Sequence, residues 1–324
     1  MIESLKILTR QYKKKKYKQT LKNVVYELTM GGTFSEALEK QGKAFPKLLI
    51  NMIKTSEMTG ELPEALDDME KYYTEADKTR RQMVTAMMYP SIVFVIATAV
   101  IIFVLMFVVP QFTEIYSTME GVEVPAFTQM VMNVSNYIKA NIFKILLIIA
   151  AIITVLVILY KKIKAFKTIV QWLLMHLPVF GNVIIYNEVT MFTKTFASLL
   201  KHNVFITDSM EILTKVTNNE IYKMLILDTV SNLAHGDKLS LSFKNHWAFP
   251  IPAYEMLVTG EQTGQLPEMM SKVSEYYQEL HKNAVTRIKT FVEPILIIAL
   301  TVIVGIIILS IIIPMFSLYE SIQA

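Results

Sequence analysis

The 324-residue chain contains no cysteine, which excludes disulfide bonds and thiolate chemistry. It has no Walker A phosphate loop, because residues 31–33, Gly-Gly-Thr, lack the Gly-Lys pair that should follow. The five histidines are scattered without metal-ligand spacing, and no Gly-x-Ser-x-Gly element occurs. We therefore expect a scaffold without catalysis, with no cofactor, no metal site and no catalytic residue.

Apolar residues make up 53% of the chain, and the mean hydropathy is +0.40. The excess lies in three runs of about 19 residues, at 91–109, 142–160 and 295–313. At ~1.5 Å rise per residue, a helix over each run spans ~28 Å, close to the thickness of a bilayer core. These runs predict three transmembrane helices and a multi-pass protein of the cell membrane.

Basic residues lie beside the apolar runs rather than on one recognition element, so we expect no direct binding of nucleic acid. The loop at 111–141 holds one Lys against three Glu. Because Lys and Arg favour the cytoplasmic side, this pattern predicts a cytoplasmic N-terminus and an extracytoplasmic C-terminus. The basic residues that set this orientation are Lys78, Arg80 and Arg81 before the first run, Lys161, Lys162, Lys164 and Lys167 after the second, and Lys282, Arg287 and Lys289 before the third.

The chain also repeats itself. Residues 45–110 align with 249–314 without a gap, and 19 of the 66 pairs are identical. Upstream of a one-residue gap, positions 205 apart match in the same way, for example Tyr17 with Tyr222. The run at 142–160 has no repeat partner. If both copies start in the cytoplasm and end in a span that leaves it, one extra span between them must bring the chain back. We assign the run at 142–160 to this returning span.

The pattern predicts an all-α membrane protein with two homologous cytoplasmic helical bundles. Helical spacing gives six helices in the second bundle, at 188–201, 207–215, 220–232, 238–243, 252–259 and 267–290. Met1 aligns near Ile206, so the first bundle should have five helices, lacking the first, and we expect its gene start to be shortened. The predicted segments are a first cytoplasmic domain at 1–86, transmembrane helices at 87–110, 142–160 and 291–313, an extracytoplasmic loop at 111–141, a second cytoplasmic domain at 161–290 and an extracytoplasmic tail at 314–324.

One turn sequence, Thr-Gly-x-Leu-Pro-Glu, occurs twice in the chain. Its glycine suits a left-handed helix end, and its proline suits the first position of the next helix, where Glu64 or Glu268 favours the helix dipole. This turn geometry does not explain the glutamate three residues before each glycine, which either bonds the turn or contacts a partner. The candidate structural or interaction residues of the turn are Glu57, Thr59, Gly60 and Pro63 in the first copy and Glu261, Thr263, Gly264 and Pro267 in the second.

Four prolines flank the first and third apolar runs. Pro90 and Pro294 stand where the runs begin and are interpreted as helix-start prolines, with a kink as the alternative. Pro110 and Pro314 stand where the runs end. Glu293 is an acid beside the third run, where either interfacial pairing or a functional role is open.

These turns, the Tyr89-Pro90 and Glu293-Pro294 pairs, the Pro-x-Phe exits at 110–112 and 314–316 and the three-run layout resemble the type II secretion F / type IV pilus PilC family of membrane platform proteins. The match covers nearly the whole chain. Within the family, the short length and the Lys-, Ile- and Asn-rich composition are most similar to ComGB, the competence member.

The resemblance implies an oligomeric platform in the cytoplasmic membrane. Its partners would be a cytoplasmic assembly ATPase and pilin or pseudopilin subunits, with DNA uptake as the process served. Three other interpretations remain: a carrier or channel subunit, a membrane enzyme, and an adaptor without a filament role. The first would need polar residues at mid-bilayer and the second a nucleophile–base or metal pair, and the sequence offers neither.

Overall fold

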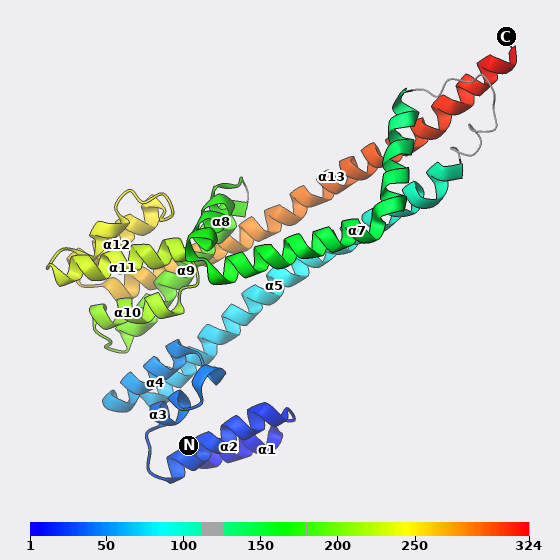
Figure 1. Ribbon diagram of the computed structural model, residues 1–324. Coiled ribbons are helices and arrows are strands. Elements are labelled where there is room, and N and C mark those ends of the chain that lie inside the picture. Colours follow the sequence, from blue (N-terminus) through cyan, green and yellow to red (C-terminus); the bar gives the residue numbers. More distant parts are fainter. Residues whose placement is uncertain (112–125, 179, 324) are drawn as a thin grey trace. The chain divides into compact units, whose positions relative to one another are not determined.

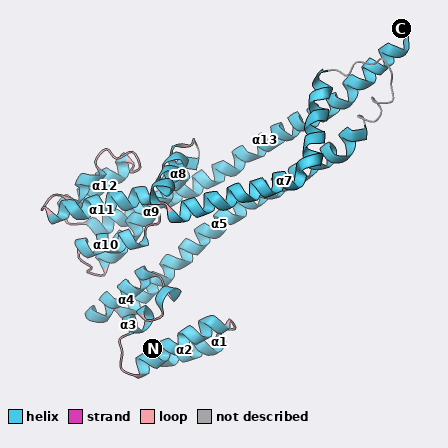
Figure 2. Ribbon diagram, viewed as in Figure 1, coloured by secondary structure: helices cyan, strands magenta, loops and turns pink. Residues whose placement is uncertain are grey.

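The computed structural model describes residues 1–111, 126–178 and 180–323. In these ranges the chain is built from helices and contains no strand, as the periodicity predicts (Figures 1 and 2). It divides into two compact units. Unit 1 comprises Met1–Arg80 and Lys167–Ala284, and unit 2 comprises Arg81–Phe166 and Val285–Ala324.

The first copy of the repeat contributes five α-helices, the number expected, and one 3-10 turn. The helix α1 packs on α2, α2 on α3, and α3 on α4. Thr33 begins α3 with a capping box, because its side chain accepts from the Glu36 N–H while the Glu36 carboxylate accepts from the Thr33 N–H. The elements are α1 (Ile2–Gln11), α2 (Lys15–Thr29), α3 (Phe34–Glu39), η1 (Gly42–Ala44), α4 (Lys47–Thr59) and α5 (Leu62–Phe103).

The second copy follows a helix that the sequence did not predict, α8 (Lys164–His176). The chain then bends by 112° into α9. Gly181 sits at this bend, where a Cβ would lie only 2.1 Å from the carbonyl oxygen of Met175, so only glycine fits. The remaining elements are α9 (Phe180–Lys201), α10 (Ile206–Val216), α11 (Glu220–Ala234), η3 (Leu239–Phe243), α12 (Ile251–Thr263) and α13 (Leu266–Gln323). The segment predicted as a helix at 238–243 is a short 3-10 helix.

Unit 1 contains two hydrophobic cores. The larger joins the second copy to α4 and α5, since Leu48, Met52 and Met69 lie in one cluster with Phe192 and Phe196. The smaller belongs to the first copy alone and is formed by Val24, Leu28, Phe34, Ala37, Leu38, Ile50 and Ile53. The helices α1 to α3 are therefore held by a modest core of their own.

Unit 2 contains the later part of α5, the π-helical turn η2 (Val104–Val108) and α7 (Ala126–Lys162). The Val109 N–H donates to the Val104 carbonyl with the i→i−5 spacing of a π-turn. The next such donor would be Pro110, which has no N–H to give to Leu105. The Ser135 hydroxyl of α7 donates to the Leu105 carbonyl instead, so the acceptor that proline leaves open is satisfied.

Two helical stretches in the described residues are long and apolar enough to cross a membrane, Leu62–Gln111 and Thr128–Lys162. They contain the predicted first and second spans. The bent pair α8 and α9 would give a third if it were one span, but α9 buries Phe192 and Phe196 in the core of unit 1. The predicted third span at 291–313 lies within α13, where many side chains fall outside the described part, and it stays a prediction.

Candidate functional site

The two repeated turns have the backbone that their sequence predicts. Gly60 ends α4 with φ of 80°, and Gly264 ends α12 with φ of 71°. Both lie in the left-handed region that an L side chain rarely adopts. Glu64 and Glu268 occupy the first turns of α5 and α13, as expected.

The prolines and threonines of the two turns lie at the ends of the helices that the turns connect. Pro63 and Pro267 are the second residues of their helices, one position later than predicted, because α5 and α13 begin at the preceding leucines. Thr59 is the last residue of α4, and Thr263 donates its hydroxyl to the Thr259 carbonyl. These residues shape the turn.

Glu57 and Glu261 hold the start of another helix rather than the turn they precede. Glu261 accepts hydrogen bonds from the Leu239 N–H at 2.6 Å, the Ser240 N–H at 3.3 Å and the Ser240 hydroxyl at 2.5 Å. A carboxylate at this place satisfies N–H groups that have no partner within their own helix and favours the helix dipole.

The first copy repeats the arrangement. Glu57 accepts from the Phe34 N–H at 2.5 Å, the Ser35 N–H at 3.1 Å and the Ser35 hydroxyl at 2.6 Å. The serines stand 205 positions apart in the sequence and the glutamates 204. The contacts identify both glutamates as helix anchors, which sequence reasoning left open because their partners lie about 20 residues away.

The prolines of the apolar runs lie inside helices. Pro90 falls within α5 and Pro294 within α13, so the helix-start interpretation of both is wrong. Apolar helices tolerate an internal proline because neighbouring groups can satisfy the carbonyl it leaves open. Pro110 follows the π-turn described above. The side chains of Pro90, Glu293 and Pro314 lie outside the described ones.

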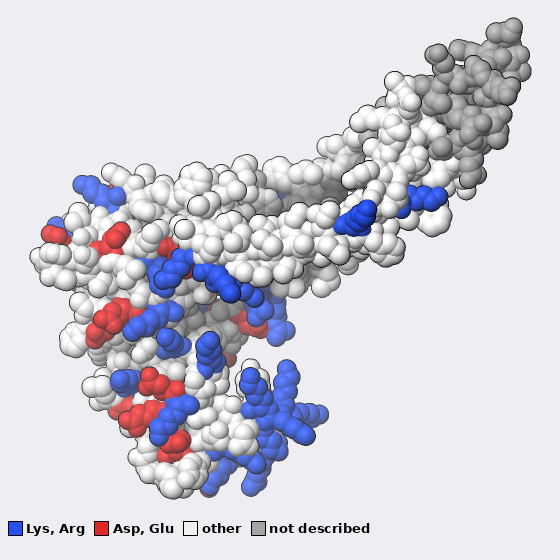
Figure 3. Space-filling view, in the orientation of Figure 1, with Lys and Arg blue, Asp and Glu red and all other residues white. Residues whose placement is uncertain are grey.

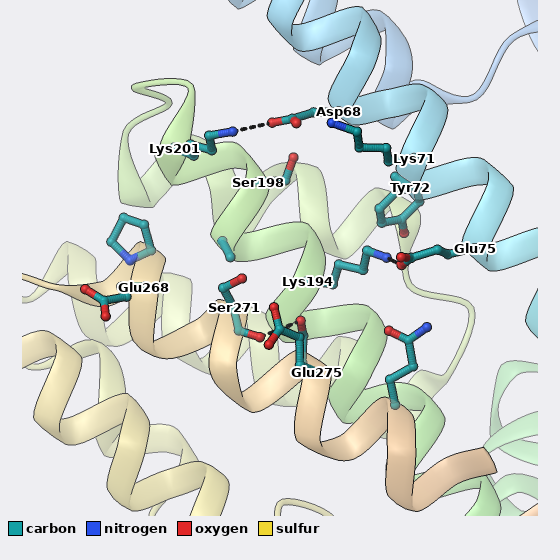
Figure 4. Close-up of a pocket in the computed structure, with 14 residues that line it drawn as sticks. Asp68, Lys71, Tyr72, Glu75, Lys194, Ser198, Lys201, Glu268, Ser271 and Glu275 are labelled. Atoms are coloured by element: carbon teal, nitrogen blue, oxygen red, sulfur yellow. Dashed lines mark hydrogen bonds and ion pairs between the residues drawn. The ribbon is translucent and has the colours of Figure 1, made fainter.

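A cleft of about 490 Å³ lies in unit 1 between α5, α9 and α13 (Figure 4). It brings together charged residues of both copies, and the predicted candidate Pro267 lies in its wall. Four acids, Asp68, Glu75, Glu268 and Glu275, face three lysines, Lys71, Lys194 and Lys201.

Asp68 of α5 joins the two copies at one end of the cleft. Lys201 of α9 donates to it at 2.8 Å, and the ring of His202 lies 3.2 Å away. Burial alone would raise the pKa of Asp68, but the hydrogen bonds from Lys201 and His202 outweigh burial and lower it. The carboxylate therefore stays ionised as a link between α5 and α9.

A second link follows one helical turn further along α5. The Tyr72 hydroxyl and the Thr195 hydroxyl lie 3.1 Å apart, and Lys194 pairs with Glu75 (Figure 4). The Lys194 ammonium also stands 5.5 Å from the Tyr72 ring centre, within the range of a cation–π contact. Burial raises the pKa of Tyr72, so its hydroxyl remains protonated at neutral pH.

The charged side chains of the cleft pair with one another within and between helices. Over the described residues, no group of three or more His, Asp or Glu side chains is placed to hold a metal ion. The lysines at its rim are engaged by acids: Lys71 by Asp67, Lys194 by Glu75 and Lys201 by Asp68.

One buried acid was missed by sequence reasoning. Glu188 of α9 is 9% exposed, and its Oε2 atom has no hydrogen-bond partner in the described structure. Burial raises the pKa of Glu188 to about 7, against a smaller opposing effect of Lys167. The signal in the sequence was a single glutamate on the apolar face of a helix.

Comparison with known proteins adds an independent line of evidence. The family model for "Type II secretion system (T2SS), protein F" matches residues 1–110 and 192–314. The chain is 32% identical over 319 residues to the type IV pilus assembly protein PilC of Thermus thermophilus, covering 98% of this chain and 78% of that protein.

Two further relatives agree. The PilC protein of Pseudomonas aeruginosa is 28% identical over 318 residues, covering 98% of this chain and 85% of that protein. The type II secretion system protein F of Xanthomonas campestris is 26% identical over 292 residues, covering 90% and 72%. With matches that extend over both copies of the repeat, the chain belongs to the type II secretion system protein F family.

Proposed function

We propose that this protein is a non-enzymatic platform in the cytoplasmic membrane that couples an assembly ATPase to the assembly of pilin or pseudopilin subunits. Membership of a family with pilus-assembly and secretion proteins supports this role. The observation that carries it is the cleft, because α5 and α13 line it and each continues as one helix into an apolar segment.

The mechanism follows from those helices. The ATPase binds unit 1 on the cytoplasmic side, with the N-terminus in the cytoplasm and the C-terminus outside. A shift of α9 acts on α5 through Asp68 and Glu75, and α5 carries the shift toward the membrane. Partly exposed ion pairs of this kind contribute about 0–1 kcal/mol each, so they can exchange partners during a working cycle.

The Lys-, Ile- and Asn-rich composition supports a competence-type role in DNA uptake. We expect no direct binding of DNA to this protein, because its basic residues lie beside the apolar runs rather than on one recognition element. A carrier or channel subunit is the rival function, and ion or solute flux through the purified protein in liposomes would favour it.

A locking experiment tests the proposal. Because the chain has no cysteine, Glu75→Cys and Lys194→Cys supply the only two thiols, and a reducible thiol-reactive cross-linker joins α5 to α9. Filament assembly in cells should stop when the link forms and return when it is reduced.

The matched control joins two positions of one helix, Glu268→Cys and Lys272→Cys, which pair four residues apart on α13. This link constrains nothing between helices and should leave assembly intact. Normal assembly by the α5–α9 locked protein would contradict the mechanism. Failure of site-specific cross-linkers placed over unit 1 to capture a co-purifying assembly ATPase would contradict the partner.

A further inference from the structure

The helix α8 turns its polar side chains toward the protein. Lys167 pairs with Glu220 at 2.7 Å, and the Gln171 amide oxygen accepts from the Glu220 N–H at 2.8 Å. Gln171 also donates to the Asn218 carbonyl at 3.3 Å, and Met175, one turn further along α8, is buried. These contacts fix α8 on the start of α11, so the helix holds one face inward and the opposite face outward.

The outward face of α8 is apolar. Ile169 is 63% exposed, Trp172 is 48% exposed and Leu173 is 55% exposed. Together with His176 they follow the i, i+3, i+4, i+7 spacing of one helix face, which we name the outer face, and it carries no Lys, Arg, Asp or Glu. A helix on the surface of a water-soluble domain has the reverse arrangement, with its apolar residues inward. The outer face is therefore built for an apolar neighbour.

Both tryptophans of the chain lie at the outer face. The ring centre of His176 stands 4.3 Å from that of Trp172 and 4.4 Å from that of Trp247, so the three rings form one row. Trp247 comes from the segment between η3 and α12 and is 44% exposed. Tryptophan is enriched at membrane–water interfaces, because its ring is apolar while its N–H can bond to water or headgroups.

The chain reaches α8 directly from an apolar helix. The helix α7 ends at Lys162 and α8 begins at Lys164, so one residue separates them. The stretch Thr128–Lys162 is long and apolar enough to cross a membrane, and it ends in the exposed pair Lys161 and Lys162. Figure 3 shows that the surface of unit 1 over α8 is mostly uncharged. If α7 spans the bilayer, connectivity puts the start of α8 at the level of the headgroups, where lysines meet anionic lipid.

We infer that α8 is an interfacial helix whose outer face, together with Trp247, rests in the headgroup layer of the membrane. A helix with an apolar, Trp-containing face and flanking lysines lies in the plane of the interface. A span made of α8 and α9 together does not fit, because α9 buries Phe192 and Phe196 in the core of unit 1. The contact needs neither an ATPase nor a filament subunit, so it can hold even where the proposed coupling fails.

Depth-dependent quenching tests the contact with the full-length protein in nanodiscs. Lipids brominated near the headgroup or near the end of the acyl chain quench tryptophans that lie at the matching depth. Because Trp172 and Trp247 are the only tryptophans, the wild-type emission comes from this surface alone. An interfacial helix lies about 5–10 Å deep, so we expect the shallow bromines to quench at least about threefold more than the deep ones.

The matched control moves the tryptophan to the far end of α11. In a Trp172→Phe/Trp247→Phe background, Leu241→Trp places one indole at a position that is 49% exposed, close to the value for Trp172. Leu241 lies in η3, which packs on the last turns of α11. At about 1.5 Å per residue, those turns lie about 18 Å along the helix from the α8 contact. This tryptophan should be quenched by aqueous acrylamide and by neither lipid.

Charges on the outer face should lift it from the lipid. Ile169→Glu with Leu173→Glu changes two exposed side chains, so the unfolding curve in detergent should match wild type. Quenching by the shallow bromines should fall at least about threefold, because carboxylates oppose insertion of an apolar face. Met224→Glu with Leu227→Glu is the matched control, since both residues are 49% exposed but lie on α11. This control should leave the quenching unchanged, and equal quenching in the two double variants would contradict the contact.

Three other outcomes would overturn the inference. Quenching by shallow bromines no stronger than in the Leu241→Trp control would place the outer face away from lipid. Stronger quenching by the deep bromines would place α8 across the membrane instead of along its surface. Protection of both tryptophans from acrylamide without quenching by either lipid would show that protein covers the face, as a second copy or another partner.

Discussion

Replacing Glu261 by Ala should destabilise the second helical copy by about 2–4 kcal/mol. The carboxylate accepts two backbone N–H groups and one hydroxyl at the start of η3. Hydrogen bonds to a charged group are worth about 1.5–3 kcal/mol, and loss of a helix cap costs about 0.5–2 kcal/mol. These contributions overlap, so the expected loss of stability is smaller than the sum of the separate values. Ser240→Ala should cost about 1 kcal/mol, since the two N–H donors keep their acceptor.

Tryptophan fluorescence during denaturant unfolding of the purified protein measures this effect. The only two tryptophans, Trp172 and Trp247, lie in or next to the second copy. Glu268→Ala is the matched control, because Glu268 is an exposed acid with only a surface pair to Lys272, and its change should stay within about 0.5 kcal/mol.

A double-mutant cycle with Ser240→Ala isolates the contact itself. Because Glu261 and Ser240 touch, the double variant should lose about 1 kcal/mol less than the sum of the single changes. Equal stability of Glu261→Ala and the Glu268→Ala control, or strict additivity in the cycle, would refute the assignment of Glu261 as a helix anchor. It would return this residue to the role of a partner contact.

Three further changes give matched tests. Because burial raises the pKa of Glu188 to about 7, the stability of the wild type should fall as pH rises through about 7. Glu188→Gln should therefore match the wild type near pH 4.5 and be more stable than the wild type by about 2–3 kcal/mol above pH 7. Denaturant unfolding at pH 5 and pH 8 measures the difference. Gly264→Ala should cost about 1–2 kcal/mol because φ is positive, whereas Gly305→Ala, in a helix with open space around it, should not lower thermal stability. Tyr222→Phe should cost about 1–3 kcal/mol by leaving a buried carbonyl unpaired, while the exposed match Tyr17→Phe should change unfolding by less than about 0.5 kcal/mol.

Local signals predicted the repeated turns well. A glycine that ends a helix and a proline in the first turn of the next act through their own backbone, so neighbouring residues decide the outcome. Gly60 and Gly264 therefore adopt the predicted conformation. The role of Glu57 needed a partner 22 residues away, and no local rule supplies that distance.

Contacts distant in sequence account for what the pattern missed. The helix α8 has a strong apolar face. It begins directly after the predicted span at 142–160, so the sequence pattern was interpreted there as a connection to the second bundle and not as a separate helix. Pro90 was interpreted as a helix start because proline is costly inside a helix in water. In an apolar helix, other groups can satisfy the open carbonyl, as Ser135 does for Leu105 beside Pro110.

The cores also show where a displacement can travel within unit 1. The duplication suggests two separate bundles, yet Leu48, Met52 and Met69 of the first copy share a core with Phe192 of α9. The helix α10 packs on α4 as well as on α9. Because close-packed interiors deform little, a partner that moved α10 would move α4 and the start of α5 with it.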